Sequence, residues 1–187
     1  MTVKTTDSKF ESKILTIPNI LSFARICMIP AIVWLYHFSC DHLAAGVLLF
    51  ISGLTDVVDG FIARKFKMIS NFGKIIDPIA DKLTQTAVMV CLCLRYPLIK
   101  LPLITLVIKE TFMATTGVLM VKTKKIVPGA SWHGKVATVL LYGMMALHIL
   151  WPDISTIYSA TTILASTTMI IISFVLYGIR NICVLEK

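Results

Sequence analysis

Six apolar runs take up most of the chain and limit the folds that are open to it. They lie at about residues 20–38, 42–64, 74–95, 101–121, 134–151 and 155–178, and each is close to the roughly 20 residues that a helix needs to cross hydrocarbon. Hydrophobic residues make up 57% of the 187 residues, and the mean hydropathy is +0.84, far above that of a soluble globular domain. We therefore predict an all-α fold, a polytopic membrane helix bundle with six transmembrane helices, formed by residues 1–187 as a single domain.

The N-terminal residues 1–18 differ from the rest because charged and apolar side chains are mixed in them. Lys9 and Lys13 stand beside Phe10 and Ile14, a pattern typical of a helix that lies on the membrane surface. We predict a short interfacial helix in this segment. The apolar run that follows is long enough to span the membrane rather than to be cleaved as a signal, so we expect the first span to stay in the mature chain.

Basic residues gather in alternate loops. The formal net charge is +8, and most lysines and arginines lie in the N-terminal segment, between the second and third runs, between the fourth and fifth, and at the C-terminus. The loops on the opposite side hold only Arg95 and Lys100. By the positive-inside rule, both termini and the connection between the second and third runs face the cytoplasm. This distribution favours anionic lipid headgroups over nucleic acid as the partner.

Four of the ten acidic residues lie within 26 positions, where the second run meets the third. On helices, the three-residue step from Asp56 to Asp59 and the four-residue step from Asp77 to Asp81 each place two carboxylates on one face. Carboxylates packed together repel one another unless cations lie among them or some of them are protonated. Hard divalent cations such as Mg²⁺ or Mn²⁺ suit such an all-oxygen site. The pattern therefore predicts a metal site on the cytoplasmic side.

Gly60, Ala63 and Arg64 follow the first acidic pair at fixed intervals. Small residues let a bulky ligand approach the backbone, and a guanidinium group binds phosphate well. The whole stretch reads D-x-x-D-G-x-x-A-R, eight residues, then G-x-x-x-D-x-x-x-D. This pattern resembles the signature of the CDP-alcohol phosphotransferase family, integral membrane enzymes of phospholipid synthesis. Residues 17–25, Ile-Pro-Asn-Ile-Leu-Ser-Phe-Ala-Arg, resemble the family's entry into its first span.

The resemblance implies a role for each matching position. Asp56, Asp59 and Asp77 would be ligands of a two-metal Mg²⁺ or Mn²⁺ centre that holds the pyrophosphate of CDP-diacylglycerol. Asp81 would be a further metal neighbour and the general base. CMP would leave, a hydroxyl compound would be the acceptor, and the resemblance also suggests a homodimer. The residues that would line the nucleotide and phosphate pocket are Asn19, Gly60, Ala63, Arg64 and Gly73.

The resemblance also favours one acceptor. The overall length, the Pro-Asn-Ile-Leu-Ser entry and residues 131–136, Ser-Trp-His-Gly-Lys-Val, look most like phosphatidylglycerophosphate synthases, which join CDP-diacylglycerol to glycerol 3-phosphate. The cations nearest to the acidic motif that would hold the acceptor phosphate are Arg25, Lys109 and Lys135.

Two departures from that group keep other acceptors open. The arginine that is usual in the second half of the fourth span is missing around Gly117, and Ala137 stands where a second basic residue is usual. The alternatives within the family are a cardiolipin synthase, whose acceptor is phosphatidylglycerol, and an enzyme that uses an amino-alcohol or inositol. From a different class, a small cation transporter would bind its ion at the acidic quartet.

Lys109 and Glu110 stand near the middle of the fourth run, where a charge that faces lipid is costly. Neighbours on a helix point about 100° apart, so we expect that these two residues do not simply neutralise each other. Each then needs a partner on another helix or in a polar cavity. At the C-terminus, we predict that the tail from Arg180 to Lys187 is a solvated cytoplasmic end.

Overall fold

The structure is a computed structural model that describes residues 17–65, 73–124 and 131–186. Within these ranges, the side chains of residues 17–18, 57, 59–65, 73–75, 121–124 and 184–186 lie outside the description. The predicted interfacial helix at residues 1–18 lies almost entirely outside the described residues.

The described residues form six α-helices and one short 3₁₀ helix, with no strand among them. The six helices coincide with the six apolar runs, so the all-α prediction is confirmed for this part of the chain. They are α1 (Ile17–His37), α2 (His42–Lys65), α3 (Gly73–Cys93), α4 (Lys100–Lys124), α5 (Trp132–Leu150) and α6 (Thr156–Glu186), with η1 (Pro97–Ile99) between α3 and α4.

Helix α6 continues past the predicted end of the last run. The prediction treats the tail from Arg180 as a solvated end, but the helix runs to Glu186 and Asn181 is fully buried. Asn181 Nδ2 donates to Thr116 Oγ1 of α4 at 3.0 Å, and Arg180 Nη1 donates to Ser131 Oγ at 2.9 Å. The prediction was wrong for the first residues of the tail because these polar groups bond to neighbouring segments, which their sequence alone does not show.

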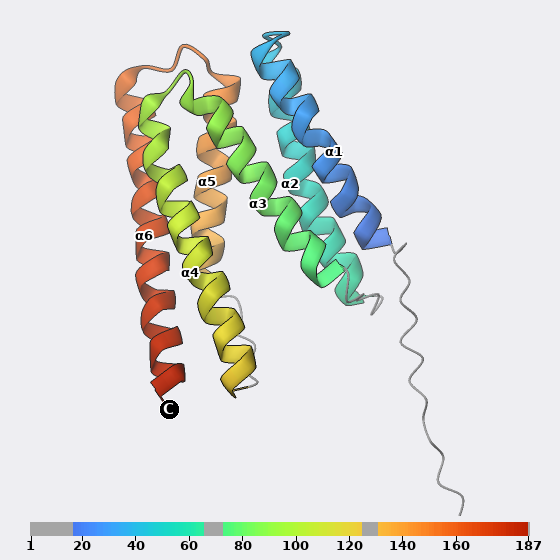
Figure 1. Ribbon diagram of the computed structural model, residues 1–187. Coiled ribbons are helices and arrows are strands. Elements are labelled where there is room, and N and C mark those ends of the chain that lie inside the picture. The colour runs from blue at the N-terminus through green and yellow to red at the C-terminus, as the bar shows by residue number, and fades with distance from the viewer. Residues whose placement is uncertain (1–16, 66–72, 125–130, 187) are drawn as a thin grey trace, which may run out of the picture.

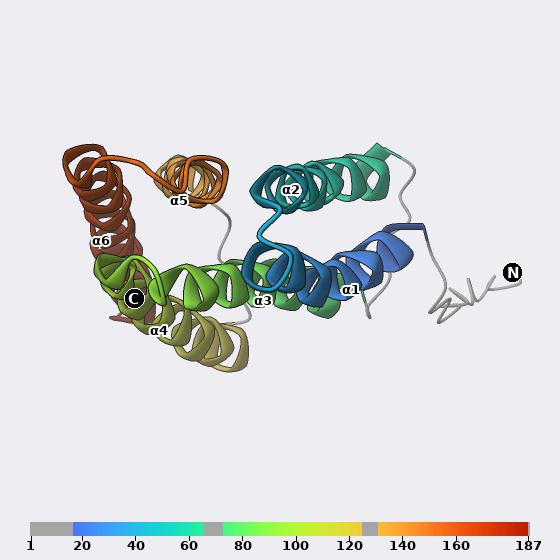
Figure 2. The same ribbon diagram turned by 90° about the horizontal axis from the view of Figure 1, so that it is seen from above.

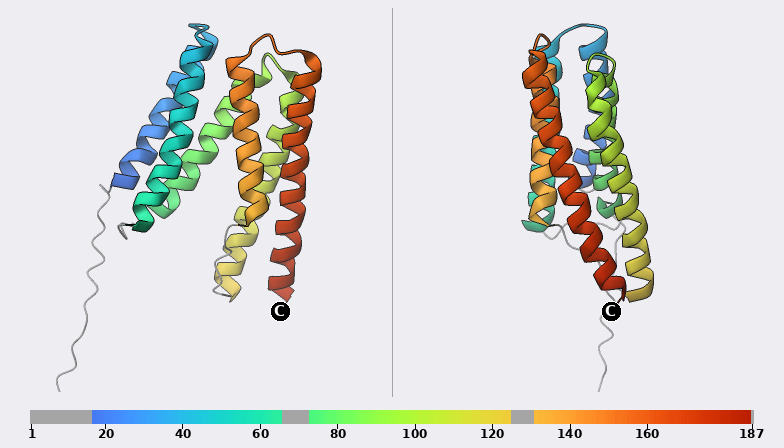
Figure 3. Two further views of the ribbon diagram at one scale, coloured as in Figure 1. Left: turned by 180° about the vertical axis from the view of Figure 1, so that it is seen from behind. Right: turned by 90° about the vertical axis from the view of Figure 1, so that its left-hand side faces the viewer.

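The helices pack as two groups of three that lie side by side (Figure 1). Helix α1 packs against α2 and α3, and α6 packs against α4 and α5. The two groups meet where α2 contacts α5 and where α3 contacts α4 and α5. Seen from above, α2 and α5 form one layer and α1, α3 and α4 form another (Figure 2), and the side views keep these layers apart (Figure 3). Helices α3 and α5 therefore carry side chains into the middle of the molecule.

Apolar side chains fill the interior and also cover much of the outside. Leu49, Met89 and Met145 are buried at 2% exposure or less, and they belong to one continuous core cluster. On the outer surface, Val139 is 70% exposed and Ile157 is 74% exposed. A surface with many apolar side chains of this size is suited to contact with lipid tails rather than water.

Four helical segments within the described residues are long and apolar enough to cross a membrane. They are Asn19–His37, Pro97–Met120, Trp132–Leu150 and Thr156–Cys183. The apolar part of α2 is shorter, at His42–Asp56, and α3 carries four charged residues in its first half. The acidic motif runs through these two helices and lowers their hydropathy. The fold is therefore that of an integral membrane protein whose acidic motif lies on α2 and α3.

Candidate active site

Side chains of α1 hold the carboxylates of Asp56 and Asp77. Arg25 Nη1 donates to Asp56 Oδ1 at 2.8 Å, and Ser22 Oγ donates to Asp77 Oδ1. Ser22 and Arg25 lie three residues apart and thus on one face of α1. Arg25 has 0% of its surface exposed. Because a buried charge is stable only when it is paired, Arg25 is a fixed positive charge beside the acidic motif.

Asp81 lies one turn after Asp77 on α3, and two neutral groups donate to it. Tyr142 Oη of α5 donates to Asp81 Oδ1 at 2.9 Å, and Gln85 Nε2 donates to Oδ2 at 2.9 Å. The carboxylates of Asp77 and Asp81 both lie within electrostatic reach of Asp56. Helices α2 and α3 thus place these three members of the quartet near one another, although they form no group of three carboxylates that could hold a metal ion among the described side chains. Because each carboxylate oxygen has two lone pairs, Asp81 retains acceptor capacity beyond these two bonds.

A cavity of about 260 Å³ lies between α3, α4, α5 and α6, and Lys82, whose Nζ lies 3.8 Å from Asp81 Oδ2, is one of its lining residues. Three helices each contribute one ammonium group to its lining, Lys82 from α3, Lys109 from α4 and Lys135 from α5. Glu110 of α4 is the acidic residue of the lining. The remaining lining residues are Met113, Ser131, Gly134, Thr138 and Tyr177.

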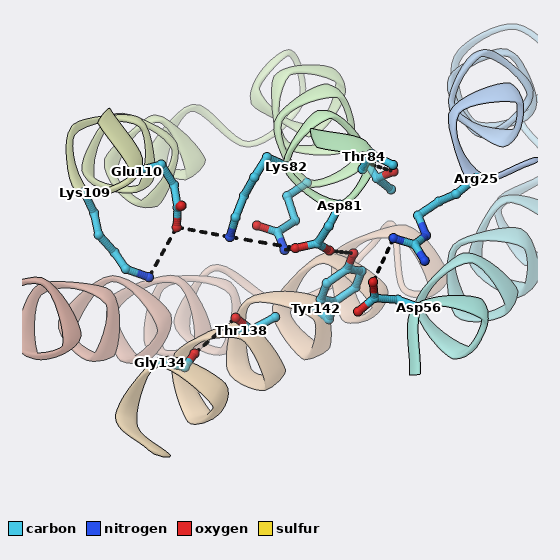
Figure 4. A network of polar contacts seen from close by, with 12 residues as sticks. Arg25, Asp56, Asp81, Lys82, Thr84, Lys109, Glu110, Gly134, Thr138 and Tyr142 are labelled. Carbon is cyan, nitrogen blue, oxygen red and sulfur yellow. Dashed lines mark hydrogen bonds and ion pairs between the residues drawn. The ribbon is translucent and has the colours of Figure 1, made fainter. Parts of the chain in front are cut away.

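Glu110 links two of the three lysines (Figure 4). Its Oε1 lies 3.0 Å from Lys82 Nζ and 3.4 Å from Lys109 Nζ. Lys82 Nζ also lies 3.8 Å from Asp81 Oδ2, so a line of charged groups runs from the cavity to the acidic motif. The expectation that Lys109 and Glu110 do not neutralise each other was wrong, because both long side chains bend toward one cavity. Glu110 also has the partner on another helix that was expected for it, which is Lys82 of α3.

The structure separates the three cations that were predicted to hold an acceptor phosphate. Lys109 and Lys135 line the cavity together. Arg25 lies on the other side of the acidic motif, against Asp56 (Figure 4). The sequence does not distinguish these residues, because all three are basic residues in or beside apolar runs and only helix packing decides which of them face the same space.

The predicted donor pocket is only partly within the described residues. Asn19 is buried at the start of α1. The positions whose surroundings lie outside the described part are Asp59, Gly60, Ala63, Arg64 and Gly73. Among the described side chains, no three His, Cys, Asp or Glu residues form a group that holds a metal ion. That set does not include Asp59, so the predicted four-carboxylate centre stays a prediction.

The sequence-based prediction misses Ser22, Gln85 and Tyr142, which all donate to the aspartates. Helical spacing could have indicated two of them. Gln85 lies four residues after Asp81 and thus on the same face of α3. Tyr142 lies seven residues, about two turns, after Lys135 on α5. The neighbourhood of Ser22 and Asp77 depends on how α1 packs, and the local sequence carries no signal for it.

Chemically, the site combines an acidic cluster with a basic cavity. Lysine side chains in the cavity can hold an anionic compound, and a carboxylate beside them can accept a proton from a hydroxyl group. The line from Lys109 through Glu110 and Lys82 to Asp81 joins these two parts. The arrangement suits a reaction in which an anionic hydroxyl compound is positioned and deprotonated.

Comparison with known proteins gives the same indication. A sequence model of the CDP-alcohol phosphatidyltransferase family matches residues 15–177. A CDP-diacylglycerol–glycerol-3-phosphate 3-phosphatidyltransferase of Rickettsia typhi is 36% identical over 137 residues, which cover 72% of this chain and 75% of that protein. The protein of the same name from Bacillus subtilis is 32% identical over 149 residues, which cover 71% of this chain and 77% of that protein.

Another relative has a different name, and its alignment covers less of this chain than those two alignments do. A cardiolipin synthase (CMP-forming) and mitochondrial hydrolase fusion protein of Schizosaccharomyces pombe is 37% identical over 113 residues, which cover 60% of this chain but only 19% of the fusion protein. The family match, by contrast, includes the whole acidic motif and all six helices except the last part of α6. The resemblance that the motif spacing indicates is therefore confirmed. The chain belongs to the CDP-alcohol phosphatidyltransferase family.

Proposed function

We propose that this chain transfers a phosphatidyl group from CDP-diacylglycerol to glycerol 3-phosphate and releases CMP. Family membership identifies it as a phosphatidyltransferase of phospholipid synthesis, and relatives named for this acceptor are 36% and 32% identical to it. The observation that carries the choice of acceptor is the cavity with three lysines next to Asp81.

The charge of the cavity supports a phosphate monoester as the acceptor. Three ammonium groups and one carboxylate give its lining a net charge of about +2 at neutral pH. A phosphate monoester carries about −1.5 to −2 at pH 7, whereas a phosphodiester carries a single negative charge. The lining therefore matches the charge of glycerol 3-phosphate better than that of phosphatidylglycerol, even though the arginine near Gly117 and a basic residue at Ala137 are missing.

Asp56, Asp59, Asp77 and Asp81 are the residues we propose for a Mg²⁺ or Mn²⁺ site. The described carboxylates fit such ions because they offer only oxygen ligands, which hard cations prefer. They also carry more negative charge than Arg25 beside them neutralises. Bound there, divalent ions would neutralise charge on the phosphoryl oxygens of the donor. For the nucleotide and phosphate pocket we propose Asn19, Gly60, Ala63, Arg64 and Gly73.

The chain's own side chains account for the positioning and the proton transfer. Lys82, Lys109 and Lys135 would hold the acceptor phosphate in the cavity, which directs the acceptor hydroxyl toward Asp81. The hydroxyl oxygen forms a bond to the phosphorus that carries the diacylglycerol, the bond from that phosphorus to the CMP oxygen breaks, and the hydroxyl proton moves to Asp81. Tyr142 and Gln85 hold the Asp81 carboxylate in place.

We also propose that all six helices span the membrane, that residues 1–187 act as one domain, and that both termini and the acidic motif face the cytoplasm. The distribution of lysine and arginine supports this orientation. A soluble nucleotide product would then leave on the cytoplasmic side. The homodimer suggested by the family resemblance is a further proposal, which the mass of the purified protein in detergent would test.

A cardiolipin synthase is the second candidate, because one relative of that name is 37% identical over 113 residues. The family match favours either transferase over a cation transporter. Purified protein supplied with radiolabelled CDP-diacylglycerol and one acceptor at a time decides between the transferases. We expect CMP release with glycerol 3-phosphate to exceed that with phosphatidylglycerol, serine, inositol or choline. Faster release with phosphatidylglycerol would overturn the proposal in favour of the cardiolipin synthase.

A further inference from the structure

Three buried polar residues follow one another at three-residue intervals on α1. They are Asn19, Ser22 and Arg25, and this spacing places them along one side of a mostly apolar helix. Burial of a polar group costs free energy unless the group is hydrogen-bonded, and alanine is a better helix former than asparagine or serine. The helix itself therefore gives no reason for these residue types, and the reason has to lie in the contacts that they make.

The hydroxyl group of Ser22 contacts a different helix. Thr55, Thr84 and Thr105 donate to the carbonyl oxygen one turn earlier on their own helices, which is a common local bond. Ser22 Oγ instead donates to Asp77 Oδ1 of α3, 55 positions further along the chain. Because Ser22 is fully buried in the packed face of α1, this bond fixes the place of one Asp77 oxygen relative to α1.

Arg25 fixes a second carboxylate in the same way. Its Nη1 lies 2.8 Å from Asp56 Oδ1 of α2. Ser22 and Arg25 lie about one turn apart on one helix, whereas the two aspartates that they hold come from two different helices. The relative positions of the Asp56 and Asp77 carboxylates are thus set by bonds to α1.

We propose that Ser22 is a positioning residue that gives the metal site its preference for small divalent cations, because it holds Asp77 in a fixed place. This inference rests on the proposed function, which takes Asp77 as a metal ligand. Mg²⁺ requires nearly ideal octahedral geometry with metal–oxygen distances of about 2.0–2.1 Å, whereas Ca²⁺ accepts irregular geometry at about 2.3–2.6 Å. A carboxylate that is no longer held should therefore impair binding of Mg²⁺ more than binding of Ca²⁺.

Ser22→Ala tests the inference without a change in the charge of the site. Electron paramagnetic resonance of free Mn²⁺ gives the Kd of the purified protein for Mn²⁺, and competition gives the Kd values for Mg²⁺ and Ca²⁺. Loss of a residue that orients a metal ligand typically weakens metal binding about 10- to 100-fold. We expect a loss of that order for Mg²⁺ and a loss of at most about threefold for Ca²⁺, so that the preference for Mg²⁺ over Ca²⁺ falls.

Two further variants separate the hydroxyl group from packing and stability. Ser22→Cys fills nearly the same space with a weak donor, so it should lose the same preference, and it carries the test if Ser22→Ala does not fold. The matched control is Ser166→Ala, which removes a buried hydroxyl that donates to Leu140 O, away from the acidic motif. We expect its Kd values for both ions to stay within about threefold of wild type. Unfolding midpoints in EDTA report the stability of each variant without metal.

Several results would overturn the inference. Equal losses of Mg²⁺ and Ca²⁺ affinity, or unchanged affinity for both, would mean that Ser22 does not determine the preference. A loss in Ser22→Ala that Ser22→Cys does not share would assign the effect to the volume of the side chain. Wild-type protein that binds no Mn²⁺ would overturn the inference together with the metal site. Wild-type protein that prefers Mg²⁺ but releases no CMP with glycerol 3-phosphate would instead overturn the proposed function and leave the inference standing.

Discussion

At the scale of single residues, the site consists of charges that are paired and of one carboxylate that is held by neutral groups. Arg25 faces Asp56, and Lys82 faces Glu110. Such pairing makes charged groups tolerable inside a membrane protein. Asp81 differs, because its two closest partners are a tyrosine hydroxyl and a glutamine amide. Neutral donors orient a carboxylate without cancelling its charge, and this is why Asp81 is suited to accept a proton.

Two substitutions separate the functions of the aspartates. Asp81→Asn removes the proposed base but leaves the other ligands in place, so we expect turnover to be abolished while CDP-diacylglycerol still binds. Asp56→Asn should weaken metal and donor binding together. Steady-state kinetics and equilibrium binding of the donor measure both effects. If Asp81→Asn kept more than about a tenth of the wild-type turnover, a loss of less than about 1.4 kcal/mol, Asp81 would not be the base.

Substitution of a lysine in the cavity should weaken binding of the acceptor and leave binding of the donor unchanged. Lys109→Ala and Lys135→Ala each remove one charged hydrogen bond to the phosphate, which typically costs about 1.5–3 kcal/mol, or roughly 10- to 150-fold in affinity. We expect the KM for glycerol 3-phosphate to rise by that order and the KM for CDP-diacylglycerol to stay nearly constant. Lys100→Ala, an exposed lysine at the start of α4, is the matched control. Unchanged acceptor KM values in both cavity variants would contradict the proposed acceptor site.

At the scale of helices, the sequence predicts well where each helix lies in the chain, but it predicts poorly which helices pack against one another. Length and hydropathy locate six helices because each apolar run must satisfy its own backbone hydrogen bonds. The motif spacing likewise places Asp77 and Asp81 on one face of α3. Which helices touch depends on side-chain packing over long sequence separations. That is why the sequence places Arg25 with Lys109 and Lys135, whereas the packing of α1 directs it to Asp56.

One glycine shows how closely α5 and α6 approach beside the cavity. A Cβ on Gly134 would lie 2.6 Å from Tyr177 Oη and 3.1 Å from the nearest ring carbon. Tyr177 is buried, and its hydroxyl accepts a hydrogen bond from the Ser131 amide at 2.8 Å. The tyrosine therefore cannot move without losing this bond and the packing of its ring on Arg180.

We expect Gly134→Ala to destabilise the protein by about 1–3 kcal/mol, the usual cost of overpacking. The measurement is the thermal unfolding midpoint in detergent. Gly143→Ala on the same helix is the control, because a Cβ there has nothing within 4 Å and alanine is the better helix former. Equal midpoints for the two variants would show that α5 and α6 are not packed this closely.

At the scale of the whole molecule, the site lies where the two groups of three helices meet. Asp56 and Asp77 belong to the first group and are held by α1, whereas Tyr142 on α5 reaches across to Asp81 on α3. The cavity continues this boundary between α3 and α4, α5 and α6. Ligands that bind to the motif and the cavity should therefore stabilise the contact between the two groups.

Metal ions provide a test of this coupling. If Mg²⁺ or Mn²⁺ binds to the acidic motif of the folded protein only, a concentration 100-fold above the Kd stabilises the fold by about 2.7 kcal/mol. We expect a higher unfolding midpoint with metal, no turnover in excess EDTA, and no metal-dependent shift in Asp56→Asn. The midpoint is independent of activity, so it reports binding directly. Full turnover in excess EDTA would contradict a metal-dependent reaction.

The orientation of the chain in the membrane can be tested with its own cysteines. Cys40 is exposed in the connection between α1 and α2, and Cys183 is exposed near the end of α6. The connection between α1 and α2 and the C-terminal end of α6 lie at opposite ends of the bundle (Figure 1). From the excess of basic residues we propose that the end that carries Cys183 faces the cytoplasm, together with the connection between α2 and α3 that the acidic motif flanks.

In variants that keep one cysteine each, a charged maleimide added to intact cells should label Cys40 at once and Cys183 only after permeabilisation. Cys27 is the control, because it is exposed in the interior of α1, where lipid rather than water should surround it, and it should stay unlabelled until detergent is added. The charged reagent does not cross the bilayer, so labelling reports the side on which each thiol lies. The reverse pattern would place the acidic motif outside the cell, away from a cytoplasmic nucleotide-linked donor, and would contradict both the orientation and the proposed function.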